Sequence, residues 1–165
     1  MYNLYLLFLS LLFWSVQGQE IRGKVVKVQD GDTFTLLTST NEQIKVRMYG
    51  IDAPEKKQPY GQASKKHLSD FIFGKTVCVV QKGKDKYKRY LGIAYLENGE
   101  NVNYRMVADG YAWHFTKYSD DTYQVALEKN ARNQKRGIWQ EPAPVSPWDF
   151  RAMTKSKKSS LAPVR

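Results

Sequence analysis

The sequence predicts an α+β fold that is mainly β, a five-stranded OB-fold barrel of Greek-key type with about three helices. Three observations favour it. Three strand-like segments follow one another near the beginning, a helical segment interrupts them, and two further strand-like segments come next. Segments with helical periodicity follow these strands to the end of the domain. This order of short strands around one helix is typical of a small Greek-key barrel.

The expected strands show either alternation of apolar and polar residues or short apolar runs rich in β-branched residues. Asp30-Gly31 and Asn41-Glu42 are turn signals between the first three of them. Pro54 ends the third, because proline disfavours continued ladder pairing. Five segments meet this description: residues 21–28, 33–37, 43–51, 76–81 and 90–96.

The expected helices are segments in which apolar residues recur at helical spacing and a glycine follows the last turn. The first covers residues 60–73 and stops at Gly74. A short one covers residues 102–108, and a longer one covers residues 120–136. Gly110 and Gly137 follow these two segments and are expected to end them.

The two ends of the chain differ from the centre. Residues 1–18 are expected to be a signal peptide, because their apolar run is shorter than the ~20 residues that span a bilayer. This predicts a secreted or periplasmic protein. Residues 19–140 are expected to form the OB-fold domain. Residues 141–165 are expected to be a proline-containing basic tail, flexible from Lys155 onward.

The net charge of +10 indicates a polyanionic partner, either nucleic acid or an anionic membrane. Cys78 is the only cysteine, so the chain forms no internal disulfide. It lies in an apolar run and is expected to be an inert core thiol. The two histidines are far apart in sequence with no cysteine near either, which argues against a structural zinc site.

Charged residues that suit phosphodiester chemistry cluster in three short motifs. Asp32 and Asp52 could supply oxygen ligands to a hard cation, which polarises phosphoryl oxygens. Arg47 and Arg89 could bind the same oxygens with guanidinium forks. Glu55 could activate water as a general base. Each residue type is commonplace alone, and Asp30-Gly31 by itself favours an ordinary hairpin turn.

Several ordered motifs together are more specific. DGDTF, VRMYGIDAPE, YGQASKKHL, DKYKRYLGIAYL, ADGYAW and RGIW resemble the staphylococcal nuclease-like (thermonuclease) family. The resemblance extends from about Ile21 to Trp139, and PWDFR at Pro147–Arg151 is similar to the end of bacterial members. It implies an OB-fold, calcium-dependent nuclease that cleaves DNA and RNA, favours single strands and leaves 3′-phosphate products.

Carried over residue by residue, the resemblance implies a role for each matching position. One calcium ion would be held by the carboxylates of Asp32 and Asp52 and the carbonyl of Ala53. Asp30 would support this site. The other roles are divided between catalysis, by Arg47, Glu55 and Arg89, and substrate binding, by Lys86, Tyr87 and Tyr118.

The sequence departs from the family at a second pocket tyrosine, which is Thr116 here. Trp113 and Phe115 are the aromatic residues that could replace it in base stacking. The rival interpretations are a non-catalytic OB-type nucleic-acid-binding module and a cationic surface-interacting protein that uses Lys155 to Lys158. For the nuclease, a monomer is expected, with DNA and RNA as its partners and without stable insertion into a membrane after signal cleavage.

Overall fold

The structure of the protein is a computed structural model that describes residues 19–160, so the expected signal peptide lies outside the described residues. Within this range no helix combines the length and apolarity needed to cross a membrane. The elements follow one another as β1 (Glu20–Val28), β2 (Thr33–Leu37), β3 (Gln43–Met48), β4 (Ile51–Asp52), α1 (Gly61–Ile72), β5 (Thr76–Lys84), β6 (Tyr90–Leu96), α2 (Val102–Ala108), β7 (Trp113–His114), α3 (Thr122–Asn133), the 3-10 helix η1 (Gly137–Gln140) and α4 (Pro147–Ser160).

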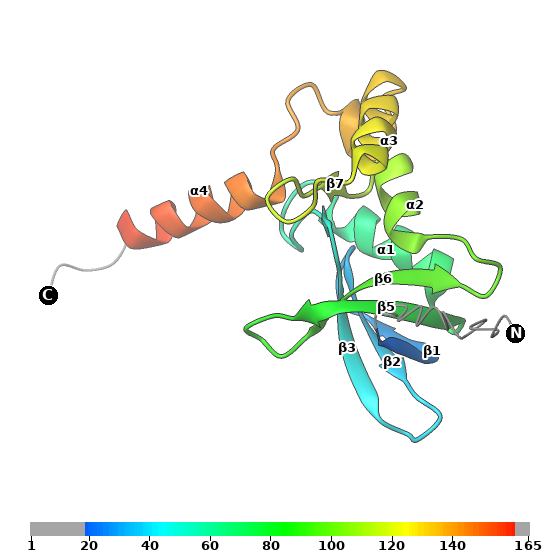
Figure 1. The fold of residues 1–165 in the computed structure, drawn as a ribbon. Coiled ribbons are helices and arrows are strands. Elements are labelled where there is room, and N and C mark those ends of the chain that lie inside the picture. The colour runs from blue at the N-terminus through cyan, green and yellow to red at the C-terminus, as the bar shows by residue number, and fades with distance from the viewer. Residues whose placement is uncertain (1–18, 161–165) are drawn as a thin grey trace, which may run out of the picture.

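Five strands close into a barrel in the order β1-β2-β3-β6-β5, with β5 returning to β1 (Figure 1). Every neighbouring pair is antiparallel except β3 and β6, which run parallel. The N-terminal half of β1 pairs with β5 and its C-terminal half with β2, so one curved strand serves both neighbours. The predicted five-stranded OB-fold barrel is therefore confirmed.

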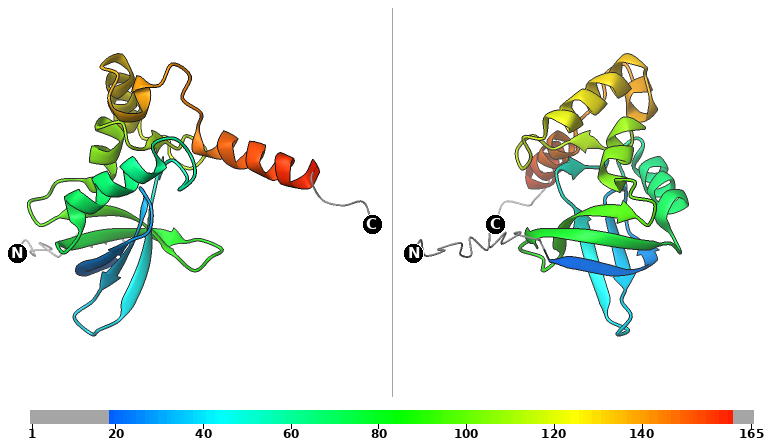
Figure 2. Two further views of the ribbon diagram at one scale, coloured as in Figure 1. Left: turned by 180° about the vertical axis from the view of Figure 1, so that it is seen from behind. Right: turned by 45° about the vertical axis from the view of Figure 1, so that its right-hand side comes forward.

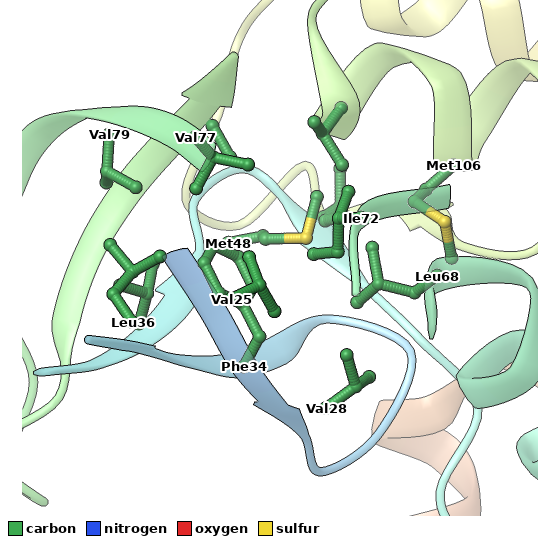
Figure 3. Close-up of a cluster of buried hydrophobic side chains, with 14 of the residues drawn as sticks. Val25, Val28, Phe34, Leu36, Met48, Leu68, Ile72, Val77, Val79 and Met106 are labelled. Carbon is green, nitrogen blue, oxygen red and sulfur yellow. The ribbon is translucent and has the colours of Figure 1, made fainter. Parts of the chain in front are cut away.

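The core fills the barrel and continues under α1 (Figure 3). Alternate strand residues such as Val25, Phe34 and Val79 are fully buried, as the period-two pattern predicts. Leu68 and Ile72 lie four residues apart on one face of α1 and are also fully buried. Helix α1 therefore packs against the barrel and contributes to the same core.

Helices α2 and α3 pack against each other above the barrel (Figure 2). Each begins at a side-chain cap. Asn101 accepts a hydrogen bond from the Tyr104 backbone, and Asp121 accepts from the backbones of Tyr123 and Gln124. A second cluster of buried residues lies between α3 and η1, and it contains Trp113, Ala131, Ile138 and Trp139.

Asp121→Ala is expected to lower the free energy of unfolding by about 1–2 kcal/mol. Asp121 caps α3 and also accepts a hydrogen bond of 2.7 Å from the Tyr104 hydroxyl, so the change removes both contacts. Urea unfolding measures the effect. Asp120→Ala is the matched control, because Asp120 is exposed and should stay within about 0.5 kcal/mol of wild type. Equal stability of the two variants would contradict the assignment of the cap.

The C-terminal segment differs most from the prediction. It forms a fourth α-helix, α4, which projects away from the barrel (Figures 1 and 2), and the expected flexible tail is helical as far as Ser160. Ser146 accepts a hydrogen bond from the Asp149 backbone and donates to the Asp149 carboxylate, which is a capping box with Pro147 at the first helical position. The sequence SPWD is therefore a helix start.

Two strand boundaries also differ from the prediction. The third predicted strand, residues 43–51, is divided: β3 ends at Met48, Gly50 turns with a φ of 75°, and Ile51–Asp52 forms β4 against β7. Strand β5 continues to Lys84, three residues beyond the predicted end. Both differences lie beside the pocket described next.

Candidate active site

One pocket of about 1100 Å³ lies where β3, β4, the β5–β6 hairpin and α4 meet. Its lining includes every residue that the sequence singled out as a site residue. The structure therefore brings together side chains separated by up to 88 positions (from Asp30 to Tyr118). These residues are Asp30, Asp32, Arg47, Asp52, Ala53, Glu55, Lys86, Tyr87, Arg89 and Tyr118.

Asp32 is fixed at the end of the turn that joins β1 to β2. The Asp30 carboxylate accepts a hydrogen bond of 3.1 Å from the Asp32 backbone, and the Met48 backbone donates to the Asp32 carbonyl. Gly31 has no left-handed φ, but a Cβ there would lie 1.9 Å from Ser64 Oγ. Glycine is required because the turn packs closely on α1, so the expected hairpin signal is also a packing requirement of the site.

Arg47 bridges the two buried aspartates. The β2–β3 register pairs Thr33 with Arg47 and so places Arg47 beside Asp32. Arg47 Nη1 lies 2.5 Å from Asp32 Oδ2, and Arg47 Nη2 donates to Asp52 Oδ1 at 2.7 Å. The Ala53 backbone also donates to Asp32 Oδ2, at 2.7 Å. The carboxylates of Asp32, from the β1–β2 turn, and Asp52, from β4, thus converge on one point of the pocket, as the sequence predicted.

Burial shifts both carboxyl groups. It raises the pKa of Asp32 to about 6, although the Arg47 guanidinium beside it acts in the opposite direction. Burial also raises the pKa of Asp52, against the hydrogen bond from Arg151 and the charge of Arg47. A buried carboxylate whose ionised form is destabilised gains strongly from any additional cation, so this pair is suited to bind one.

Glu55 lies in the loop between β4 and α1, and Gln58 fixes that loop. The Glu55 backbone donates to Gln58 Oε1 at 3.0 Å, and the Gln58 backbone donates to the Glu55 carbonyl at 2.8 Å. Gln58 Nε2 donates in turn to the Val145 carbonyl. Buried Gln58 therefore connects the loop of Glu55 to the segment that leads into α4.

Arg89 lies at the end of the β5–β6 loop, directly before β6, and Asp85 holds it there. Asp85 Oδ2 accepts from Arg89 Nε at 2.7 Å, and Asp85 Oδ1 accepts from the backbones of Tyr87 and Arg89. These hydrogen bonds outweigh burial and lower the pKa of Asp85. The guanidinium is oriented through Nε, and Nη1 makes a long hydrogen bond of 3.4 Å to Thr33 Oγ1, so Nη2 and the other Nη1 proton can donate to an anion in the pocket.

Aromatic side chains form the outer wall of the pocket. Tyr87 and Tyr118 are 68% and 58% exposed, as expected of groups that stack on a ligand. Phe115 also lines the pocket, with Thr116 between it and Tyr118 on the same wall. Trp113 does not belong to the lining, because it is buried against Trp139 and its exposed fraction is 8%. Of the two aromatic replacements considered from the sequence, only Phe115 is in position.

Sequence reasoning missed three residues of the site. Asp85 orients Arg89, as described above. Trp148 and Arg151 lie on α4, which the sequence analysis treated as part of a basic tail. Trp148 stacks on Phe115 with ring centroids 5.2 Å apart. Arg151 contacts two of the predicted acidic residues. The capping box at Ser146 was the signal that could have identified this helix.

The residues present fit a hard cation. In the described part of the chain no three histidine, cysteine, aspartate or glutamate side chains cluster as a metal site. The available donors are the two convergent carboxylates of Asp32 and Asp52, with the Ala53 carbonyl and solvent in the open pocket. Oxygen donors of this kind suit calcium, whose coordination is flexible and often includes water.

Taken together, the barrel and its pocket define an OB-fold protein with a charged pocket on one side of the barrel. Guanidinium groups line it from β3 and from the residue before β6, carboxylates line it from the β1–β2 turn and β4, and aromatic rings form its rim. The chain belongs to the family described as staphylococcal nuclease homologue, whose model matches residues 45–141.

Named relatives agree with this assignment. An uncharacterized endonuclease of Haemophilus influenzae is 44% identical over 132 residues, which cover 80% of this chain and 74% of the relative. An uncharacterized endonuclease of Escherichia coli O157:H7 is 42% identical over 145 residues, covering 88% and 94%. The micrococcal nuclease of Shigella flexneri is 36% identical over 147 residues, covering 83% and 84%.

Proposed function

We propose that this protein is a calcium-dependent nuclease that hydrolyses DNA and RNA with little sequence preference and leaves 3′-phosphate products. Its family makes it a hydrolase that acts on nucleic acids. The proposed reaction at a calcium ion rests on one observation. Two arginines far apart in the sequence and three carboxylates, Asp32, Asp52 and Glu55, line a single pocket.

The residues divide the work between binding the phosphodiester and activating water. Asp32, Asp52 and the Ala53 carbonyl would hold a calcium ion, which would supply Lewis-acid stabilisation to the phosphoryl oxygens. Arg47, on β3, and Arg89, directly before β6, line the same pocket and donate N–H groups to the same phosphate, where negative charge increases in the transition state.

Glu55 is the candidate general base. Its side chain is 41% exposed at the pocket, so a water molecule can reach it. Glu55 accepts a proton from this water as the water oxygen attacks phosphorus. The bond from phosphorus to the 5′ oxygen breaks, the 5′ oxygen takes up a proton, and the phosphate remains on the 3′ side.

Broad substrate range follows from the chemistry of these groups. The arginines bind phosphate, which carries no sequence information, while Tyr87 and Tyr118 can stack on any base. Stacking requires an unpaired base, which favours single-stranded substrates. Activity should weaken as salt rises, because phosphate contacts release counterions. Export from the cytoplasm and a monomeric state belong to the same proposal and rest on the sequence.

The direct test is degradation of single-stranded DNA by the purified protein with calcium or with a chelator. Calcium-dependent cleavage is expected, with 3′-phosphate ends on the products. Glu55→Gln should lower the rate by about 10²–10⁴, because it removes the base while leaving both cation ligands. Salt-sensitive binding of DNA by folded protein, without cleavage in calcium, would instead identify a non-catalytic binding module and refute the proposal.

A further inference from the structure

Helix α4 inserts one cationic side chain, Arg151, into the candidate active site. Arg151 Nη2 donates to Asp52 Oδ2 at 2.7 Å, and Arg151 Nη1 lies 3.3 Å from Asp52 Oδ1. The same Nη1 donates to Glu55 Oε1 at 2.7 Å. One guanidinium therefore binds both a proposed cation ligand and the proposed general base.

The position of Arg151 is fixed by contacts of α4 that do not involve the carboxylates. Trp148, three residues earlier, stacks on Phe115 and packs edge-on against Trp113. The Ser146 capping box begins the helix, and Gln58 binds the preceding Val145 carbonyl. The helix N-terminus is thus anchored to the body of the protein. The Arg151 side chain is 43% exposed, so it can leave the carboxylates without disrupting this anchor.

The oxygens of Asp52 are already engaged by guanidinium groups. Oδ1 accepts from Arg47 Nη2 and contacts Arg151 Nη1, while Oδ2 accepts from Arg151 Nη2. A cation that uses Asp52 must take at least one of these oxygens. A guanidinium and a divalent cation bound to the same carboxylate repel each other, and a protein surface screens this repulsion less than bulk water does. Simultaneous binding of Arg151 and a divalent cation to the Asp52 carboxylate is therefore unfavourable.

We infer that Arg151 is an internal counter-ion that competes with the cation for Asp52, so that cation binding displaces it from both Asp52 and Glu55. The inference rests on the proposed cation site. Coupling between two ligands of one site is reciprocal. The contact of Arg151 with Asp52 therefore lowers the affinity for the cation, and a bound cation weakens that contact to the same extent. Displacement also releases Glu55 Oε1 to a water molecule. Through Arg151, helix α4 thereby controls cation binding at Asp52 and the access of water to Glu55.

Calcium titration calorimetry on the purified protein without nucleic acid tests the competition. Arg151→Ala is expected to bind calcium about tenfold more tightly than wild type, which corresponds to about 1.4 kcal/mol. Arg151→Lys keeps the charge but loses the fork, and an intermediate affinity is expected. Lys155→Ala is the matched control. It removes one positive charge from an exposed position one turn further along α4, and wild-type affinity is expected.

Hydrogen exchange of the wild-type protein provides a second measurement that requires no variant. Saturating calcium is expected to accelerate exchange of the α4 amides around Arg151, while barrel amides remain unchanged or become slower. The inference is overturned if Arg151→Ala binds calcium no more tightly than wild type, or if calcium slows exchange in α4. In both cases calcium-dependent cleavage by the wild type would still support the proposed function. Wild-type protein that neither binds calcium nor cleaves DNA would refute both proposals.

Discussion

Asp32→Asn is expected to lower calcium affinity at least about 100-fold and the rate of DNA cleavage about 10³-fold, without lowering the stability of the fold. The replacement keeps the size of the side chain and an oxygen that can accept from the Ala53 backbone, but it removes the charge that holds the cation. Calorimetric calcium titration and a cleavage assay at pH 8 measure the two losses.

The stability of this variant follows from the sign of the pKa shift. The pKa of Asp32 in the folded protein is about 6, above the ordinary value of 3.8. Ionised Asp32 therefore destabilises the fold above pH ~6, and this cost disappears as the pH falls toward ~4. Urea unfolding at pH 8 in chelator should give a free energy for Asp32→Asn equal to or above that of wild type.

The same shift predicts the pH dependence of calcium binding. Affinity of the wild type should fall as the pH drops below about 6, because a proton then competes for Asp32. Asp32→Asn should show a shallower dependence. Asp70→Asn is the matched control, because Asp70 lies on α1 with an exposed side chain and should leave calcium affinity unchanged. Wild-type calcium affinity in Asp32→Asn would contradict the assignment of this ligand.

Arg89→Ala is expected to reduce kcat/KM for single-stranded DNA about 10²–10³-fold, the usual cost of removing a donor to a developing anion. The Asp85 carboxylate keeps its two backbone hydrogen bonds in this variant, so the hairpin should persist. Calcium affinity without nucleic acid should change little, since Arg89 contacts neither Asp32 nor Asp52 in the hydrogen bonds and ion pairs of the described residues.

Two further variants separate the effect of the planar Arg89 guanidinium from the effect of its positive charge. Arg89→Lys keeps the charge without the planar fork, and a partial loss of rate is expected. Arg22→Ala removes a positive charge from an exposed position on β1, outside the pocket lining, and should cost little activity. If Arg22→Ala and Arg89→Ala lost activity equally, Arg89 would contribute only to the general basic field of the protein.

The barrel and the candidate site were predictable because their signals are local. Alternation of apolar and polar residues marks β1 and β3, and each site residue lies in a short motif. The structure also contains contacts between distant residues, which no local sequence pattern predicts. Asp85 orients Arg89 through a hairpin loop, and Gln58 connects the Glu55 loop to Val145 across 87 positions. Such contacts depend on the closed fold.

The error at the C-terminus has a different cause. Three closely spaced prolines, Pro142, Pro144 and Pro147, favour an irregular segment, although only the first two lie outside a helix. Pro147 follows the capping residue Ser146, and proline is favoured at the first helical position because no hydrogen bond is lost there. Recognising that start would have placed Arg151 on a helix face. Its distant contacts with Asp52 and Glu55 would still have required the fold.

The parallel ladder between β3 and β6 has a consequence for inactivation. Only three residue pairs form it, Val46 with Tyr90, Arg47 with Leu91, and Met48 with Gly92. This seam sets the separation between Arg47 and Arg89, and a slip of one residue would move one arginine by ~3.3 Å relative to the other. Fraying confined to so short a seam needs far less free energy than global unfolding. On warming, catalysis should therefore be lost before the rest of the barrel unfolds. The temperature dependence of the cleavage rate then reports the local stability of the β3–β6 ladder.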